Sequence, residues 1–279
     1  MKTCDLHTHS VFSDGTYTPA EIIDSAIEAG LSAIALCDHN TIDGLPHFLS
    51  AAKSKSIEAV AGAEFSVDLD GKELHLLGLF ISPKYFAQIS EMTASSNKLK
   101  EQSNIELIAS LGNAGVKLDY GEIKQKTPNG QVNRAHIAAA LTEKGYTTSI
   151  GHAFDTLLSR SAGHYKEPKR ATVWEMIDFI NSIGSVPVLA HPFLNLTEEA
   201  LADFLPLAKK RGLGGMECYY SLYDENTTAL SLELAEHFGL AKSGGSDFHG
   251  AHKPDIQLGV GKGNLKIPYE WYLNLKSLI

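Results

Sequence analysis

Two histidines separated by one residue, His7 and His9, stand near the N-terminus, and Asp14 follows five residues after the second. Side chains on an extended chain repeat every two residues, so both imidazoles point the same way if this stretch is a strand. Two imidazoles beside a carboxylate are natural donors to a divalent metal ion. Because an isolated His-x-His can also be ordinary surface, the argument depends on what recurs later in the chain.

The same residue types recur where predicted strands end. They are Asp38, His39, Glu64, His191, Asp247 and His249, and His75 stands near the start of its predicted strand. Six of the 12 histidines thus fall at such junctions, next to carboxylates. Burying that many carboxylates together is unfavourable without cations, so we expect a metal cluster. A set of His, Asp and Glu without thiolates suits Zn, Mn, Fe or Mg and does not choose among them.

The elements that must position these side chains alternate along the first 83 residues. Apolar runs predict strands at 3–6, 32–37, 57–63 and 74–81, and helices at 18–30 and 43–55. The first helix has the clearest signals, with Thr18 and Glu21 forming a capping box, Pro19 at the first position and Gly30 at the end. Such alternation predicts a parallel barrel or sheet whose active site lies at the C-terminal edge of the strands.

The alternation stops and later resumes. Between residues 84 and 170 helical periodicity dominates and we predict no strand. Beyond residue 170 we predict helices at 173–184, 197–210 and 230–239, and strands at 186–190, 214–218 and 241–244. Pro187 weakens the prediction of the strand that contains it. We therefore predict a barrel built from residues 1–83 and 171–279, interrupted by a helical insertion at 84–170.

The composition is that of a globular protein, with 43% hydrophobic and 20% charged residues among 279. No apolar run approaches a membrane span and no signal peptide is apparent, so we expect a cytoplasmic protein that does not bind membranes. Three cysteines far apart in sequence predict buried thiols. The net charge of −9 disfavours long nucleic acid but permits a small phosphorylated substrate. Nothing in the sequence indicates a protein partner.

Taken in order, the motifs resemble those of the PHP (polymerase and histidinol phosphatase) family. They are His7-x-His9, Asp14-Gly15, Asp38-His39, Gly62-Ala63-Glu64, His75, Ala190-His191-Pro192 and Gly245-Ser246-Asp247-Phe248-His249. The resemblance spans residues 5–250 apart from the insertion. It implies an α/β fold, a distorted seven-stranded β/α barrel with a metal cluster at its C-terminal mouth.

The resemblance also implies three metal positions for two or three divalent ions. The first would be held by His7, His9, Glu64 and Asp247, the second by Glu64, His75 and His191, and the third by Asp14, His39 and His249. Some relatives have a histidine in place of Asp14, and an oxygen ligand there favours a harder metal. We interpret Asp38 as a residue that orients a histidine rather than a direct ligand.

Such a cluster fits hydrolysis of a phosphate ester, because a hydroxide that bridges two metal ions is a nucleophile at neutral pH. Within the family the chain resembles bacterial phosphatases of 3',5'-nucleoside bisphosphates or mononucleotides. Asn133-Arg134-Ala135-His136 is similar to the Arg-x-His substrate-binding segment of that subgroup. The insertion would then be a lid. We predict that its Arg134, Ala135, His136 and Arg160, with Asp14 and His39 of the barrel, contact the substrate. Backbone N–H groups at the start of this helix could also face an anion.

Other readings remain open at this point. The same chemistry could serve a 5'→3' exoribonuclease on short RNA or a histidinol phosphatase, although the insertion argues against the latter. A PHP module that binds metal without activity is an alternative of another class, but it would be expected to lack some ligands. The acid that protonates the leaving group could be Asp38, His136 or a metal-bound water.

Overall fold

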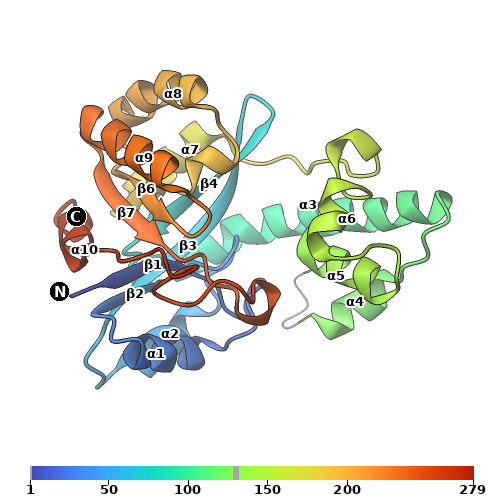
Figure 1. Cartoon of the computed structure of the whole chain (residues 1–279), viewed down its shortest axis with the longest axis horizontal. Coiled ribbons are helices and arrows are strands. Elements are labelled where there is room, and N and C mark those ends of the chain that lie inside the picture. The colour runs from blue at the N-terminus through green and yellow to red at the C-terminus, as the bar shows by residue number, and fades with distance from the viewer. Residues whose placement is uncertain (1, 128–131) are drawn as a thin grey trace.

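The computed structural model describes residues 2–127 and 132–279, and seven strands in chain order form a nearly closed barrel (Figure 1). The strands are β1 (Cys4–Thr8), β2 (Ala33–Leu36), β3 (Glu58–Leu69), β4 (Lys72–Leu79), β5 (Val186–Leu189), β6 (Gly215–Tyr220) and β7 (Ala241–Gly245). The first and last strands meet through two backbone hydrogen bonds at their C-terminal ends. One runs from His9 N to Phe248 O and the other from Asp247 N to His7 O. The distorted seven-stranded barrel is thereby confirmed.

Helices surround the barrel. They are α1 (Pro19–Glu28), α2 (Leu45–Ala52), α7 (Val173–Ser182), α8 (Glu198–Lys210), α9 (Glu225–His237) and α10 (Tyr269–Lys276). The capping box predicted for α1 is present, because the Thr18 side chain accepts from Glu21 N and the Glu21 side chain accepts from Thr18 N. Helix α2 is shorter than predicted, and α10 has no counterpart among the predicted elements. Among the described residues, no helix has the length and apolar character needed to cross a membrane.

The pairing of β4 corrects the prediction of a parallel barrel. This strand runs antiparallel to both β3 and β5, while the other pairs are parallel. Only Asp70 and Gly71 connect β3 to β4, both at positive φ (50° and 80°), as in a two-residue hairpin turn. Strand β3 therefore continues to Leu69 instead of ending at residue 63. As a result, Glu64 lies in the middle of a hairpin and not at a strand end.

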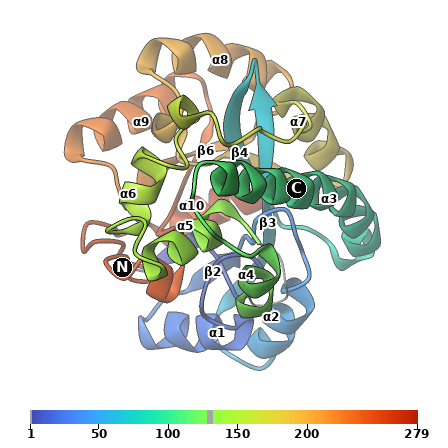
Figure 2. The same ribbon diagram turned by 90° about the vertical axis from the view of Figure 1, so that its right-hand side faces the viewer.

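The insertion consists of α3 (Phe86–Asn113), α4 (Tyr120–Lys126), α5 (Arg134–Glu143) and α6 (Ile150–Asp155). No strand occurs among its described residues, as predicted. The four helices share a small apolar core of their own, which includes Leu107, Leu111, Ile137 and Leu141. They lie across one end of the barrel (Figure 2), while α10 lies at the opposite end (Figure 1). The boundaries at residues 84 and 170 stay a prediction.

The barrel has two apolar layers. One fills the space between the sheet and its outer helices, with Ile22, Phe48 and Phe65 fully buried. The other lies inside the barrel and includes Leu6, Leu77 and Tyr272 of α10. Because apolar side chains fill the barrel interior on the α10 side, its polar residues gather at the mouth beneath the insertion. The three cysteines are buried free thiols, as predicted.

Candidate metal and substrate site

His7 lies in β1 and His9 directly follows the strand, and both side chains are completely buried. Their Nε2 atoms are 3.0 Å apart, so the two rings converge on one point, as the His-x-His spacing predicts. The strand is longer than predicted, because backbone pairing with β2 continues to Thr8. His7 is therefore held by the barrel itself and not by a loop.

Glu64 lies at the centre of the histidines. Its Oε2 atom is 3.2 Å from His7 Nε2 and 3.3 Å from His9 Nε2. Its Oε1 atom is 2.7 Å from His75 Nδ1 and 2.9 Å from His191 Nε2. The hairpin register explains this geometry, since His75 pairs with Ser66 and so shares a face of the sheet with Glu64.

Asp14, His39 and His249 form a neighbouring group. Asp14 Oδ1 is 3.3 Å from His249 Nε2, and Asp14 Oδ2 is 3.8 Å from His39 Nε2. Asp247 Oδ1 lies 3.1 Å from His9 Nε2 and completes the cluster. The structure thus brings together all nine residues that the sequence analysis proposed as metal ligands. Which of them holds which ion stays a prediction.

Several buried ligand atoms of the cluster have no hydrogen-bond partner among the described residues, as expected of a site that binds cations. In the part of the chain that the structure describes, His9 Nδ1, Asp14 Oδ1, Glu64 Oε2 and His75 Nδ1 are buried and accept or donate no hydrogen bond. The described residues form four overlapping groups of possible ligands, and within each group the ligand atoms lie within 4.8 Å of one another. Buried donors are normally satisfied. The donor set therefore fits several divalent cations.

Burial and close charges shift the titration of the cluster strongly. Burial lowers the pKa of His9, but the adjacent carboxylates of Asp247 and Glu64 outweigh it and raise the pKa to about 9. Burial likewise opposes the charged form of His75, and Glu64 raises its pKa to about 10. Burial lowers the pKa of His39 to about 3. The two raised pKa values reflect the carboxylates beside these rings, and the lowered one reflects burial.

Strained backbone occurs where the chain leaves three of the strands. His191 has φ 28°, Asp247 has φ 55° and Asn40, next to His39, has φ 48°. Non-glycine residues in this region cost about 1–3 kcal/mol each, so such strain is retained where the surrounding structure enforces it. Here it turns two predicted ligands and the neighbour of a third into the barrel mouth.

Glu217 and Lys253 contact the cluster, and neither was singled out from the sequence. Glu217 of β6 contacts His7 Nδ1 at 3.0 Å and accepts from His191 N at 2.7 Å. Lys253 Nζ donates to Asp247 Oδ2 at 2.6 Å. Glu217 carried a signal, a carboxylate inside an apolar strand, whereas nothing local in the sequence points to Lys253.

Asp38 differs from its predicted role of orienting a histidine. Its carboxylate accepts from Ser10 N, Ser10 Oγ and Ser13 Oγ, at 2.6–2.8 Å. It therefore fixes the loop after β1, and it does not hydrogen-bond a histidine within the described residues. The carboxylate that orients His7 is Glu217.

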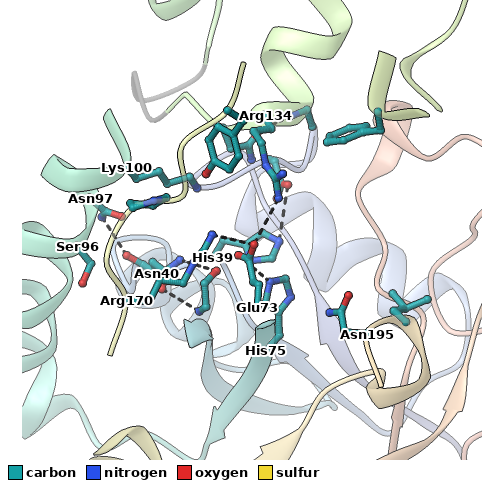
Figure 3. A pocket seen from close by; sticks show the side chains of 18 of the residues that line it. His39, Asn40, Glu73, His75, Ser96, Asn97, Lys100, Arg134, Arg170 and Asn195 are labelled. Atoms are coloured by element: carbon teal, nitrogen blue, oxygen red, sulfur yellow. Dashed lines mark hydrogen bonds and ion pairs between the residues drawn. The ribbon is translucent and has the colours of Figure 1, made fainter. Parts of the chain in front are cut away.

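A cavity of about 530 Å³ opens between the cluster and the insertion (Figure 3). Asp14, His39, His75 and His191 form part of its floor, together with Glu73 of β4. Its other walls are formed by Ser96, Asn97 and Lys100 of α3, Asn133, Arg134 and Ala135 at the start of α5, Phe154, Tyr165, Pro168, Lys169 and Arg170, and Leu194 and Asn195. Four cationic side chains thus face the cavity beside the metal cluster.

The predicted substrate residues separate into two groups. Arg134 and Ala135 line the cavity. His136 does not line it, because its Nδ1 accepts from Asn133 N and its ring packs edge-on against His252, and both rings line a second, smaller cavity. The N–H groups of Ala135 and His136 are also unavailable to an anion, since both donate to Asn133 Oδ1.

Arg160 is likewise outside the cavity walls. It pairs with Glu167 at 2.6 Å, donates to Gly71 O, and is 64% exposed. In this arrangement Arg160 does not line the cavity, and its contact with substrate stays a prediction. Arg170, which was not proposed from the sequence as a substrate residue, lies at the cavity wall and is only 9% exposed.

Comparison with known proteins gives concordant matches. A model of the PHP domain matches residues 5–184. A 5'-3' exoribonuclease of Haemophilus influenzae is 31% identical over 249 residues, which cover 89% of this chain and 90% of that protein. A 3',5'-nucleoside bisphosphate phosphatase of Chromobacterium violaceum is 30% identical over 255 residues, which cover 89% and 88%. The solved structure of a candidate metal-dependent phosphoesterase from Bifidobacterium adolescentis aligns with a TM-score of 0.86 at 25% identity, covering 99% of this chain and 96% of that one.

Proposed function

The chain belongs to the PHP domain family and is a metal-dependent phosphoesterase, and from this premise we propose that it hydrolyses phosphate monoesters of small nucleotides. The observation that carries the proposal is the cavity beside the metal cluster, which is lined by Lys100, Arg134, Lys169 and Arg170. One phosphate would lie on the cluster, and a second would lie among these cations. A 3',5'-nucleoside bisphosphate carries both.

The cluster supports the reacting phosphate. When bound, divalent cations neutralise the phosphoryl oxygens and lower the pKa of the attacking water. The chain's own contribution is to hold the donors in place before any ion arrives. Glu217 fixes the His7 ring, and Lys253 with Tyr220 fixes the outer oxygen of Asp247. Positioning of this kind reduces the reorganisation that the reaction would otherwise require.

The insertion supports the second phosphate. Lys100 makes no hydrogen bond or ion pair with any described residue, and burial lowers its pKa. Arg134 donates to Glu73 at 3.4 Å, so most of its guanidinium N–H groups remain for a ligand. An arginine fork and an ammonium are the groups that proteins use for phosphate.

Aromatic side chains in the same wall favour a nucleoside over a simpler ester. Phe154 and Tyr165 line the cavity, and the guanidinium carbon of Arg134 lies 4.5 Å from the Tyr165 ring centre. Aromatic and guanidinium planes stack readily on nucleobases. A volume of about 530 Å³ is that of a small-ligand site and suits one nucleotide.

A 5'→3' exoribonuclease is the second candidate. It is supported by the relative from Haemophilus influenzae, which bears that name and matches over nearly the whole chain. The same cluster would cleave at the end of a short RNA. The net charge of −9 makes long RNA a poor ligand.

A substrate panel tests the proposal. Metal-loaded protein is assayed with adenosine 3',5'-bisphosphate, a 5'-mononucleotide, histidinol phosphate and a short 5'-phosphorylated RNA. We expect the bisphosphate to have the highest kcat/KM. A strong preference for the RNA would replace the phosphatase proposal with the exoribonuclease one, and turnover of histidinol phosphate alone would contradict both.

Arg134→Ala tests the second-phosphate site directly. We expect KM for the bisphosphate to rise about 10–100-fold, because a charge-assisted contact of about 1.5–3 kcal/mol is lost, while metal content stays normal. Arg160→Ala is the matched control, since that arginine is exposed and pairs with Glu167. If Arg134→Ala and Arg160→Ala have equal kinetics, Arg134 does not bind the second phosphate.

A further inference from the structure

Glu73 is an unexpected carboxylate among the cations of the cavity. It lies in β4 two residues before His75, and its side chain is 21% exposed. Its Oε2 atom accepts from Arg170 at 2.8 Å and from Arg134 at 3.4 Å, and its Oε1 atom is 3.6 Å from His75 Nε2 (Figure 3). One carboxylate thus faces cationic groups from three parts of the chain.

The two arginines are bound unequally. Arg170 is held firmly, because its two terminal nitrogens donate to different carboxylates, one to Glu73 at 2.8 Å and the other to Glu167 at 2.9 Å. Among the described residues, Arg134 is held by the longer contact to Glu73 and by cation–π contacts with aromatic rings. Arg170 therefore anchors Glu73, while Arg134 can exchange Glu73 for another anion.

The charge of Glu73 has a direct consequence for any phosphate that enters. Glu73 forms ion pairs with Arg170 at 2.8 Å and with Arg134 at 3.4 Å, so it places a negative charge between the two arginines. An anion that binds Arg134 must share that arginine with Glu73 and lie close to its negative charge. The attraction of the cations is reduced by this repulsion.

We propose that Glu73 is the resident counter-ion of the second-phosphate site, and that it limits how tightly this site holds the phosphate that stays on the product. In the free enzyme it prevents unpaired cations from being buried beside one another. In the complex it weakens the site enough for the product nucleotide to leave. This inference rests on the proposed function, since it presumes a substrate with a second phosphate.

Glu73→Gln separates charge from shape, because the glutamine oxygen can still accept from Arg170. Binding of adenosine 3',5'-bisphosphate, of 5'-AMP and of adenosine, which carries no phosphate, to the full-length protein is measured by calorimetry, with metal depleted to prevent turnover. We expect the variant to bind the bisphosphate and 5'-AMP roughly tenfold more tightly than the wild type, the size of one screened charge contact, and adenosine equally. With metal loaded, KM and kcat for the bisphosphate should both fall, as release of a tightly held product becomes slower.

Glu167→Gln is the matched control, because Glu167 also pairs with Arg170 but does not line the cavity. It should leave all of these affinities unchanged. Glu73→Ser repeats the charge removal if the glutamine variant is unstable, and thermal melting of each variant reports on folding. If the role of Glu73 is purely structural, Glu73→Gln and Glu73→Ser should both bind the bisphosphate more weakly than the wild type. That result would overturn the inference.

The controls also separate this inference from the proposed function. If the wild type binds the bisphosphate no more tightly than adenosine, there is no second-phosphate site, and both proposals fail together. If the wild type prefers the bisphosphate to adenosine and Glu73→Gln does not increase that preference, the role of Glu73 alone is refuted.

Discussion

Glu217 contacts two of the predicted metal ligands, although it does not line the cavity. Its two oxygens hold His7 Nδ1 and His191 N from opposite sides, and its side chain is fully buried. A carboxylate on Nδ1 fixes the His7 tautomer that leaves Nε2 free to bind a cation. Its neighbours Met216 and Cys218 pack in the outer apolar layer, so the alternation of side chains along β6 points Glu217 into the barrel.

We expect Glu217→Gln to weaken metal binding about 10–100-fold, the usual effect of losing the partner of a ligating histidine. In the variant, the side-chain amide nitrogen must face either His7 Nδ1 or His191 N, the two donors from which the Glu217 carboxylate accepts. Competition with a fluorescent chelator measures the affinity. Glu236→Gln is the control, since Glu236 is 79% exposed and pairs only with Lys242. An unchanged affinity would show that His7 needs no such support.

At this scale, the sequence analysis identified residues by type and by their place near strand ends. That reasoning located nine clustered side chains, because most of the strands are parallel and deliver their ends to one edge, although Glu64 and His75 meet through the antiparallel hairpin. It missed Glu73, and it did not single out Glu217 and Lys253. Arg170 is 97 residues from Glu73, and His7 is 210 residues from Glu217. Lys253 lies only six residues from Asp247, but it reaches that carboxylate by the path of the intervening loop.

At the scale of elements, α5 positions Arg134 through its cap. Asn133 accepts from Ala135 N and His136 N, and its own N–H donates to His136 Nδ1. The capping box fixes the first turn of the helix, and with it the direction in which Arg134 leaves the backbone. The sequence predicted a helix start here, but the cap consumes the N–H groups that were expected to face an anion.

We expect Asn133→Ala to lower the stability of the insertion by about 1 kcal/mol and to raise KM for the bisphosphate, because the first turn of α5 frays. Asn133→Ser retains a capping oxygen and should restore most of both losses. Asp119→Ala is the control, since Asp119 caps α4, a helix that contributes no residue to the cavity walls. Amide hydrogen exchange in α5 and steady-state kinetics provide the two readings. Loss of exchange protection without a change in KM would uncouple the cap from substrate binding.

The hairpin β3–β4 explains why the element prediction was only partly correct. Alternating apolar runs predict strands but not their direction, and the predicted strands end at residue 63 and begin again at 74, so no turn is predicted at Asp70-Gly71. Direction matters here, because the antiparallel register places His75 beside Glu64. The insertion, by contrast, was recognisable from its helical periodicity alone.

At the scale of the whole molecule, the metal cluster exists only when the two ends of the barrel meet. His7 comes from β1, and Asp247 and His249 follow β7. A side chain on Gly245 would place its Cβ 2.2 Å from His7 Cβ, so only glycine lets β7 lie this close. The sequence motifs at the two termini therefore describe one site, which no local pattern could position.

Asp5 holds this closure. Its buried carboxylate accepts from Ser246 N at 2.9 Å, Ser246 Oγ at 2.6 Å and Gly259 N at 2.8 Å. It also accepts from His7 N at 3.3 Å, two residues along its own strand. A single side chain thus joins β1, the end of β7 and the C-terminal loop directly behind the metal ligands.

We expect Asp5→Asn to destabilise the protein by about 1–3 kcal/mol, because the amide nitrogen meets donors where the carboxylate oxygens accepted. Metal affinity should fall at the same time, since His7 and Asp247 flank the broken contacts. Thermal melting is recorded without metal and at saturating metal, and Asp24→Asn on the exposed face of α1 is the control. Glu217→Gln should differ in kind, with a large loss of metal affinity and a much smaller loss of metal-free stability. If Asp5→Asn lowers stability and leaves metal affinity intact, the cluster is held by the individual strands, and closure of the barrel is not what assembles it.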